Sequence, residues 1–587
     1  MEGADVFESV LIANRGEIAV RIARGCREFG IRTIAVYSEA DRDALHVQVC
    51  DEAYLLGPAD PASSYLDVER IIDVVRRSGA QAVHPGYGFL AENADFARAV
   101  AEADAVFIGP SPEAIERMGD KLSARAVARA AGVPVVPGTV DPTDDPAVAI
   151  AFGDEHGYPV AVKAMFGGGG RGMKVVRDAS EMEAALASAA REAGVAFGRS
   201  ECYLERYLER PRHVEVQVIG DQDGTVVHLA DRDCSLQRRH QKLIEEAPAP
   251  GIDPKVRAAL HEAAVRVSKE MRYENAGTCE FLLDEDGQRF YFLEMNTRLQ
   301  VEHPVTELVT GVDLVHAQLR VAAGEGLGFS QDDVRLRGHA IEARINAEDP
   351  GAGFMPSPGT VSRLEAPLGP GVRLDTGLRS GDTIAREYDS MVAKLIVWAE
   401  DRTTACHRLD IALEGLVVDG IPTTIPFHRL AVTHPDFLAG SHATSSVERE
   451  WDLSSLTPSD AAIEAGASAR QREELLTVEL NGRRFDVRVH SPVRSARPMR
   501  RASRATARAA SGGAATGEIL APMQGTIIGY AVEPGAQVAQ GDPVVTLEAM
   551  KMENTLRAPV AGTVVSTGTA PGSVVQPGAL LAVIEPA

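Results

Sequence analysis

ESVLIANRGEIAVRIARGCREFGIRTIAVY, residues 8–37, decides the class of the fold. The apolar run at 9–13 predicts a short strand, and Asn14–Glu17 predict a turn. The apolar spacing in residues 19–29 predicts a helix, and TIAVYS at 33–38 predicts the next strand. Strand, helix and strand in this order form a βαβ unit, which indicates an open parallel sheet. No GxGxxG motif follows the first strand, so the pattern does not favour a dinucleotide site.

The length of 587 residues is too great for one hydrophobic core, because cores stop growing at about 250–300 residues. The chain carries 60 Lys+Arg against 84 Asp+Glu, a net charge of -24. So acidic a surface repels phosphate backbones and anionic lipid, which argues against nucleic acid or a membrane as partner. No apolar run approaches the roughly 20 residues of a membrane span.

Six scattered cysteines without a CxxC pair predict reduced thiols and a cytoplasmic location. The first residues, MEGADVFESV, lack the basic start and apolar stretch of a signal peptide, which supports the same expectation.

Composition and patterning divide the chain into five expected segments, and the fold class is α/β and α+β multidomain. The expected segments are 1–120, 121–330 with a lid at about 133–205, 331–450, 451–516 and 517–587. Within 451–516, alternation around Asn481-Gly482 predicts a hairpin over 476–489. Residues 494–516 consist mainly of Arg, Ala, Ser and Gly, which is typical of a flexible linker. The six arginines between Arg494 and Arg508 leave an electrostatic tether to the acidic body as the alternative.

The last segment contains an internal repeat with a spacing of 37 residues. APMQGTI at 521–527 recurs as APVAGTV at 558–564, and Pro534-Gly535 recurs as Pro571-Gly572. Two such copies predict a small two-fold β-sandwich. Lys551 lies between the copies, in EAMKMEN. It is either a surface lysine of a hairpin or a site of covalent modification, and its presentation between two methionines favours modification.

The string Ala549-Met550-Lys551-Met552 resembles the attachment motif of the biotinyl domain in biotin-dependent carboxylases. Lipoyl carriers, which are closely related, usually show Asp-Lys-Ala around the lysine. The resemblance therefore implies covalent biotin on Lys551, attached by a biotin protein ligase.

The first 450 residues or so resemble biotin carboxylase, an ATP-grasp ligase. The matching strings are IANRGEIA, HPGYGFLAEN, MGDK, GGGGRGM, RDCSLQRRHQK, EEAPAPG, EMNTRLQVEHPVTE, RINAEDP and YDSM. This implies an N-terminal biotin carboxylase domain at 1–120, an ATP-grasp domain at 121–330, a C-terminal domain at 331–450 and a biotinyl carrier at 517–587. The segment DGIPTTIPFHR resembles α subunits of acetyl- and propionyl-CoA carboxylases.

The resemblance implies that bicarbonate and ATP carboxylate the attached biotin through carboxyphosphate, with Mg²⁺, or Mn²⁺ in its place. The carboxyl group then passes to acyl-CoA on a separate carboxyltransferase β subunit, as in fatty acid biosynthesis, within an α/β complex that contains several copies of the α chain. The β subunit decides which acyl-CoA is used. The alternatives are an ATP-grasp ligase with a lipoyl-type carrier, an α subunit for a non-CoA acceptor, and a non-catalytic carrier scaffold.

Three features of the central segment indicate phosphate and metal chemistry by themselves. The loop Gly167–Gly172 lets backbone N–H groups approach phosphate oxygens, unless it is a plain flexible turn. Lys163 lies on an apolar strand, where an unpaired lysine is costly, so it predicts a ligand anion. Glu280 and Glu294 lie in two apolar strands, and with Asn296 they predict a Mg²⁺ site. Pairing of both carboxylates with arginines is the alternative.

The other site residues are assigned by the resemblance. Arg298, Gln300 and the Val301 backbone would hold bicarbonate. Glu302 would be the general base, and Arg344 would stabilise the charge that develops on the ureido oxygen of biotin. Lys242, with His240, would position bicarbonate or the phosphates, and Lys121 would be a second phosphate clamp. The remaining ATP contacts implied are Gly168, Gly169, Gly170, Gly172, Met173, Glu205, Leu208, His213 and Gln237. His213 alone could equally be a packed histidine.

Overall fold

A computed structural model describes most of the chain. The described residues are 6–139, 143, 145–164, 174–197, 202–459, 471–480, 483–492, 517–521, 525–549, 552–575 and 578–586. No helix among them is long and apolar enough to cross a membrane. All six cysteines are free thiols, as the sequence predicts.

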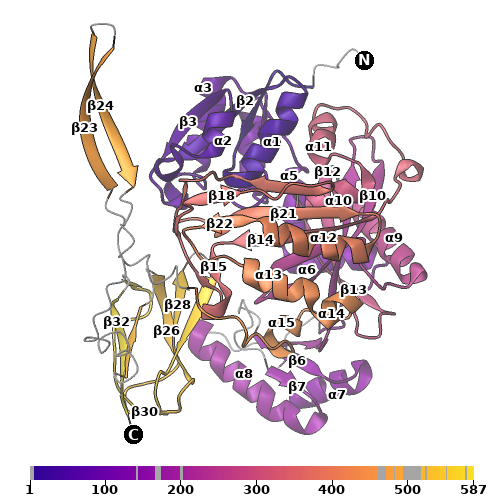
Figure 1. The fold of residues 1–587 in the computed structure, drawn as a ribbon. Coiled ribbons are helices and arrows are strands. Elements are labelled where there is room, and N and C mark those ends of the chain that lie inside the picture. The colour runs from indigo at the N-terminus through magenta and orange to yellow at the C-terminus, as the bar shows by residue number, and fades with distance from the viewer. Residues whose placement is uncertain are drawn as a thin grey trace, which may run out of the picture.

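The N-terminal domain contains a five-stranded parallel sheet in the order β3-β2-β1-β4-β5, shown in indigo in Figure 1. Its strands are β1 (Ser9–Ile12), β2 (Arg32–Ser38), β3 (Glu52–Gly57), β4 (Ala82–His84) and β5 (Val106–Phe107). Its helices are α1 (Gly16–Glu28), α2 (Leu45–Val49), α3 (Val68–Ser78), α4 (Ala94–Glu102) and α5 (Pro112–Gly119). The predicted βαβ unit and open parallel sheet are confirmed.

The centre of the molecule is one eight-stranded sheet in the order β13-β12-β9-β10-β11-β14-β21-β19. These strands are β9 (Arg212–Gly220), β10 (Val226–Arg238), β11 (Gln241–Ala247), β12 (Asn275–Leu283), β13 (Phe290–Asn296), β14 (His339–Asn346), β19 (Val372–Thr376) and β21 (Met391–Ala399). The sequence predicts that residues 331–450 form a further α+β piece packed on the central segment. In the structure β14 pairs with β11, so the two segments share a sheet and a hydrogen-bonded seam.

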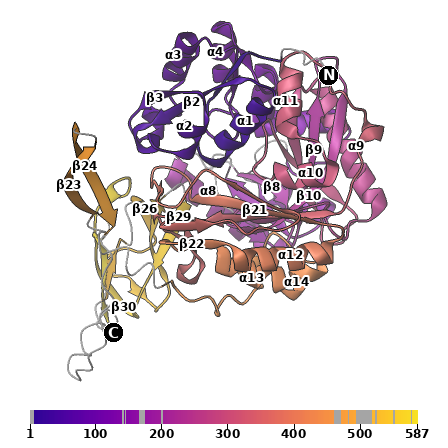
Figure 2. The ribbon, with the colours of Figure 1, turned by 45° about the horizontal axis from the view of Figure 1, so that its top comes forward.

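The two faces of this sheet differ in chemistry because side chains alternate along each strand. One face is apolar and packs against α9 (Pro254–Glu270) and α12 (Arg402–Gly415). The other face carries charged side chains, and α10 (His303–Thr310) packs over part of it. Figure 2 shows α10 beside β10 and α12 beside α13 and α14. The charged face is therefore where a site can form.

Shorter elements complete this body. The helices are α6 (Lys121–Ala130), α11 (Leu314–Ala322), α13 (Ile425–Thr433), α14 (Pro435–Ala439) and α15 (Ser446–Arg449). The short strands are β15 (Glu348–Asp349), β16 (Met355–Pro356), β17 (Gly359–Thr360), β18 (Arg363–Glu365), β20 (Thr383–Ile384) and β22 (Val417–Asp419).

A small subdomain occupies the predicted lid region. Its sheet, β7-β6-β8, contains β6 (Val160–Ala164), β7 (Lys174–Val176) and β8 (Cys202–Arg206), with α7 (Pro146–His156) and α8 (Met182–Phe197). It has its own apolar cluster, which includes Val160, Val162, Leu186 and Leu204. A separate core suits a unit that moves as one body, and its closure over ATP stays a prediction.

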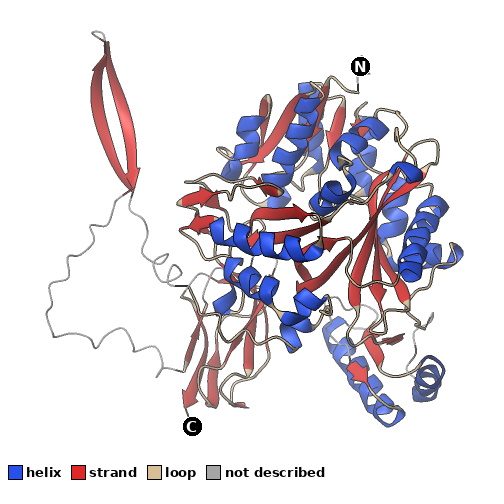
Figure 3. Ribbon diagram, turned by 45° about the vertical axis from the view of Figure 1, so that its right-hand side comes forward, coloured by secondary structure: helices blue, strands red, loops and turns tan. Residues whose placement is uncertain are grey.

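The C-terminal domain is a sandwich of two four-stranded sheets, β25-β32-β30-β27 and β29-β28-β26-β31. Figure 3 shows it as strands and loops. The strands are β25 (Glu518–Leu520), β26 (Gly525–Tyr530), β27 (Gln537–Val538), β28 (Pro543–Ala549), β29 (Met552–Arg557), β30 (Gly562–Thr567), β31 (Val574–Val575) and β32 (Leu580–Pro586).

The sandwich follows the predicted repeat. β26, β27 and β28 recur as β30, β31 and β32 with the same lengths, each 37 residues later. The turn glycines recur too: φ is 94° at Gly535 and 85° at Gly572, where a residue with a Cβ would be strained. The predicted hairpin is also present, as β23 (Gln471–Leu480) and β24 (Arg483–Pro492), and it is longer than the predicted 476–489.

The segment 452–459 packs onto the body beyond the last helix. Leu453 and Leu456 contact the main apolar cluster, and the backbone N–H of Ser459 donates to Asp349 Oδ2 at 2.9 Å. Gly351 makes this approach possible, because an added Cβ would lie 2.1 Å from the carbonyl carbon of Thr457. The described part of this segment is therefore held against the body as far as Ser459.

Gly351→Ala is expected to displace this segment, because the atoms that the new methyl group would meet are backbone atoms. Hydrogen exchange of a peptide covering 452–459 should become faster than in the wild type. Gly353→Asn is the matched control: Gly353 has φ of 69° and open space around it, and asparagine tolerates that conformation. Unchanged exchange in Gly351→Ala would show that the segment is not held by this contact.

Candidate active site

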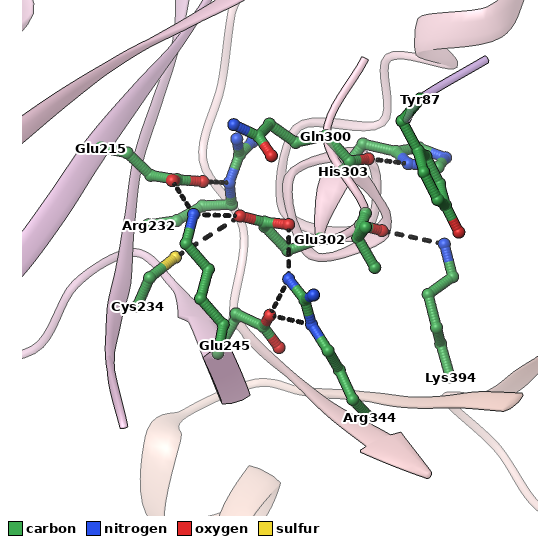
Figure 4. Close-up of polar contacts among 12 residues, drawn as sticks. Tyr87, Glu215, Arg232, Cys234, Glu245, Gln300, Glu302, His303, Arg344 and Lys394 are labelled. Carbon is green, nitrogen blue, oxygen red and sulfur yellow. Dashed lines mark hydrogen bonds and ion pairs between the residues drawn. The ribbon is translucent and has the colours of Figure 1, made fainter. Parts of the chain in front are cut away.

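Glu302 lies at the centre of the charged face, immediately before α10, and its side chain has no solvent exposure. Its Oε1 accepts a hydrogen bond from Lys242 Nζ at 2.6 Å, and its Oε2 accepts one from an Arg344 Nη at 2.9 Å (Figure 4). Burial alone would raise the pKa of Glu302. The charges of Lys242, Arg344 and Arg232 outweigh burial and hold that pKa well below its usual range. The carboxylate is therefore ionised at neutral pH, as a general base must be.

Lys242, on β11, joins three buried carboxylates. Besides Glu302, its Nζ donates to Glu215 Oε2 at 2.7 Å and to Glu280 Oε1 at 3.1 Å. Burial opposes the charge of Lys242, but the negative groups around it raise its pKa well above the usual value. The ammonium group is thus a fixed positive charge beside the Glu302 carboxylate, where it can stabilise negative charge.

The predicted Arg344 lies on the opposite side of Glu302 from Lys242. Its guanidinium also donates to Glu245, on the neighbouring strand β11. Burial raises the pKa of Glu245 to about 7, although Arg344 opposes this shift. Glu342 lies directly opposite Glu245 in the β11–β14 register, and neither of its oxygens has a hydrogen-bond partner among the described residues. Burial raises the pKa of Glu342 well above its usual value.

Arg232 is a second buried cation beneath the site, with no solvent exposure. It donates to Glu215 at 2.5 Å, to Gln217 at 2.8 Å and to Thr306, on α10, at 2.9 Å. It therefore anchors Glu215, the partner of Lys242, and ties α10 to the sheet. Glu215, Arg232, Glu245 and Glu342 are absent from the sequence prediction. The sequence signal that could have identified each of these four residues is a charged side chain within an otherwise apolar strand.

The three residues predicted to bind Mg²⁺ lie together. Glu280 and Glu294 are directly opposed in the β12–β13 register, and Asn296 Nδ2 lies 3.3 Å from Glu294 Oε1. Burial would raise the pKa of Glu280, but Lys242 and His213 hold it below its usual range, so it is ionised. Two carboxylates and an amide oxygen are ligands that suit Mg²⁺. The residues fit the ion. Among the described residues, the charged or ionisable partners of Glu280 are Lys242 and His213, so it is not paired with an arginine as the alternative predicted.

Arg298 and Gln300 lie beside this group. One Nη of Arg298 donates to Gln300 Oε1 at 3.1 Å and the other to Asn296 Oδ1 at 2.9 Å. Its Nε donates to Glu92 Oε2 at 2.9 Å, and the other oxygen of Glu92 accepts from the backbone N–H of Thr297. Glu92 comes from the HPGYGFLAEN loop of the N-terminal domain. That loop thus reaches the predicted bicarbonate residues.

The residues predicted to contact ATP are placed in several groups. Lys163 forms an ion pair with Glu205, which also accepts from Arg125 at 2.6 Å. His213 Nε2 lies 2.9 Å from Glu280 Oε2 and so belongs to the group of charged residues around Lys242. Leu208 packs with Val136 and Tyr291. Gln237 donates to the Cys234 carbonyl, and His240 is exposed at the β10–β11 turn.

Several predicted residues lie outside the described part of the chain. These are Gly168, Gly169, Gly170, Gly172, Met173, Lys551 and the side chain of Lys121. On either side of Lys551, Ala549 pairs with Met552 in the β28–β29 register. The predicted linker, 494–516, is also outside.

Four family profiles match the chain in order. They are "Biotin carboxylase, N-terminal domain" at 6–115, "Carbamoyl-phosphate synthase L chain, ATP binding domain" at 120–329, "Biotin carboxylase C-terminal domain" at 342–449 and "Biotin-requiring enzyme" at 517–584. A biotin-dependent acyl-coenzyme A carboxylase alpha3 subunit from Mycobacterium leprae is 49% identical over 563 residues, covering 94% of each chain. This chain belongs to the acyl-CoA carboxylase α subunits. The α subunits of this family combine an ATP-dependent biotin carboxylase with its biotin carrier, and they act with a carboxyltransferase β subunit.

Solved structures match the carboxylase part of this α chain. A biotin carboxylase–β,γ-ATP complex from Campylobacter jejuni is 47% identical, with a TM-score of 0.70, and covers 76% of this chain and 99% of its own. The biotin carboxylase domain of a thermophilic 2-oxoglutarate carboxylase bound to bicarbonate has a TM-score of 0.72 at 47% identity, covering 75% and 98%. The ATP-grasp assignment of the α subunit is thereby confirmed.

Proposed function

We propose that this α subunit carboxylates its own biotin with bicarbonate and ATP, and that Glu302 is the general base. The observation that carries the assignment is the placement of the Glu302 carboxylate between Lys242 and Arg344, without exposure to water. Removing a proton from bicarbonate creates negative charge next to the base. The two cations stabilise that charge as it forms, so the ionised Glu302 can act although its own pKa is low.

Arg298 and Gln300 hold bicarbonate within reach of Glu302 in this proposal. Arg298 can present two parallel N–H groups to a planar anion, which lysine cannot do. Its present partners, Glu92, Asn296 and Gln300, hold the guanidinium at the edge of the cluster. Glu280, Glu294 and Asn296 would hold Mg²⁺, which supplies charge neutralisation for the phosphates of ATP. Lys163, Lys121 and the loop Gly167–Gly172 complete the phosphate site.

Biotin on Lys551 accepts the carboxyl group when it is bound, and Arg344 stabilises the ureido oxygen. The acceptor is an acyl-CoA on the β subunit. Support comes from the span of the relatives: the match to the acyl-CoA carboxylase of Mycobacterium leprae covers 94% of this chain. The match to one pyruvate carboxylase component, from Methanothermobacter thermautotrophicus, covers only 76% of it, at 50% identity. A biotin protein ligase, several copies of the α chain and a cytoplasmic setting complete the proposal, and the six free thiols support that setting.

Arg298→Lys tests the assignment. ATP hydrolysis by the wild type should depend on bicarbonate and on free biotin. In the variant, kcat/KM for bicarbonate should fall about 10- to 100-fold, because a hydrogen bond to a charged group contributes about 1.5–3 kcal/mol. The KM for ATP should stay unchanged. Arg289→Lys is the control, since Arg289 is exposed and its ion pairs among the described residues are with acids of its own hairpin. A wild-type rate of ATP hydrolysis that is the same with and without bicarbonate would contradict the proposal.

A further inference from the structure

Lys394 is a fully buried lysine that the sequence motifs do not include. It lies on β21, directly opposite Arg344 in the β14–β21 register, and its side chain has no solvent exposure. A buried ammonium group is costly unless it is paired. The Nζ atom donates to the backbone carbonyl of Val301 at 2.8 Å and lies 3.1 Å from Glu17 Oε1. In Figure 4 the side chain of Lys394 reaches toward the turn that precedes α10.

The turn Gln300–Glu302 is held at two successive carbonyl groups. The carbonyl of Gln300 is hydrogen-bonded to His303 Nδ1 at 2.7 Å, and the carbonyl of Val301 accepts a hydrogen bond from Lys394. Peptide groups are planar, so fixing two consecutive carbonyls fixes the direction of the N–H groups and side chains between them. This short turn contains the Gln300 side chain, the Val301 N–H and the base Glu302.

Lys394 also connects this turn to the N-terminal domain. Glu17, in the first turn of α1, accepts a hydrogen bond from the hydroxyl of Tyr87 as well as pairing with Lys394. Tyr87 belongs to the same loop as Glu92, which contacts Arg298 and Thr297. The loop therefore contacts the segment 297–302 directly through Glu92. It is also connected to that segment indirectly, because Tyr87 bonds to Glu17, which pairs with Lys394.

The electrostatic surroundings keep this lysine charged. Glu17, Glu342 and Asp375 raise its pKa, outweighing burial and the opposing charge of Arg373. A charged donor holds a carbonyl more firmly than a neutral one, since charge-assisted hydrogen bonds are roughly twice as strong.

We propose that Lys394 is a positioning residue, which holds the Val301 carbonyl and thereby sets the Gln300–Glu302 turn for bicarbonate binding and proton removal. It touches no substrate itself. The inference rests on the proposed function of Gln300, Val301 and Glu302. It adds a residue from the C-terminal part of the sheet, and through Glu17 and Tyr87 it makes the geometry of the base depend on the N-terminal domain.

The test uses the full-length chain, a double variant that keeps the net charge, and a single variant as its control. Lys394→Met alone would leave Glu17 buried without its cation and is prone to misfold. The primary variant is therefore Lys394→Met combined with Glu17→Gln. Its control is Glu17→Gln alone, where the glutamine oxygen can still accept from Tyr87 and Lys394 can still donate to Val301. Lys394→Arg is the conservative variant, because it retains a charged donor.

The double variant should lose on the order of 100-fold in kcat/KM for bicarbonate, the loss expected when reacting groups are displaced by about 1 Å. Its KM for ATP and its melting temperature should match those of the control, and the activity of the control measures the effect of removing the Glu17 charge alone. Lys394→Arg should recover part of the loss. A folded double variant with the bicarbonate kcat/KM of the control would overturn the inference. A rise in the KM for ATP as large as the loss in kcat/KM for bicarbonate would also overturn it. Failure of the proposed function is a different result, since the wild type itself would then show no bicarbonate-dependent hydrolysis.

Discussion

Lys551→Ala is expected to abolish the biotin signal of this protein on a streptavidin blot while leaving carboxylation of free biotin largely intact. Lys551 is the only lysine between residues 517 and 587, so no other side chain of the carrier can accept biotin through an amide. It lies in sequence between two strands whose ends, Ala549 and Met552, are paired within one sheet of the two-fold sandwich. The described ion-pair partners of Glu302, which are Lys242 and Arg344, lie in other domains, so carboxylation of free biotin should persist.

Lys269→Ala is the matched control for this change. Lys269 is an exposed lysine in the last turn of α9, and its loss should leave the streptavidin signal unchanged. A signal that persists in Lys551→Ala would place biotin elsewhere and contradict the prediction. Loss of free-biotin carboxylation in the same variant would indicate that Lys551 also contributes to the carboxylase site.

The fold could be predicted from the sequence wherever a local pattern determines it. The βαβ unit of residues 8–37 and the 37-residue repeat each contain their own periodicity, and both are present as predicted. The continuous central sheet could not be predicted. β11 and β14 are separated by almost 100 residues, and nothing in either strand shows that Glu245 will lie opposite Glu342.

The motifs predicted the candidate site only in part. Arg232 lies inside a quoted motif, and Glu215 and Lys394 lie outside the motifs. None of the three was predicted, because their pairing depends on the order in which the strands lie in the sheet. The strand order β12-β9-β10-β11 brings Glu280, Glu215, Arg232 and Lys242 together. A buried charge in an apolar strand indicates that a partner exists. It does not indicate which strand supplies that partner.

Glu302→Gln is expected to lower the rate of bicarbonate-dependent ATP hydrolysis by about 10²- to 10⁴-fold, the usual contribution of a general base. Glutamine keeps the volume, and its single carbonyl oxygen can accept from either Lys242 or Arg344, but it cannot take a proton from bicarbonate. The fold should survive because neither cation is left alone: Lys242 retains Glu215 and Glu280, and Arg344 retains Glu245. Nucleotide affinity, measured by calorimetry with an ATP analogue, should remain near that of the wild type.

Glu262→Gln serves as the control for that prediction, since Glu262 is exposed on α9 and, within the described part of the chain, its ion pair is with Arg266 of the same helix. A fall in turnover of less than tenfold in Glu302→Gln would show that another group removes the proton. Glu245 would then be the next candidate, because its pKa of about 7 makes it the better proton acceptor at neutral pH and it shares Arg344 with Glu302. The same measurements on Glu245→Gln separate the two. If Glu302 is the base, Glu245 acts only by orienting Arg344, and its loss should weaken the use of biotin more than that of bicarbonate.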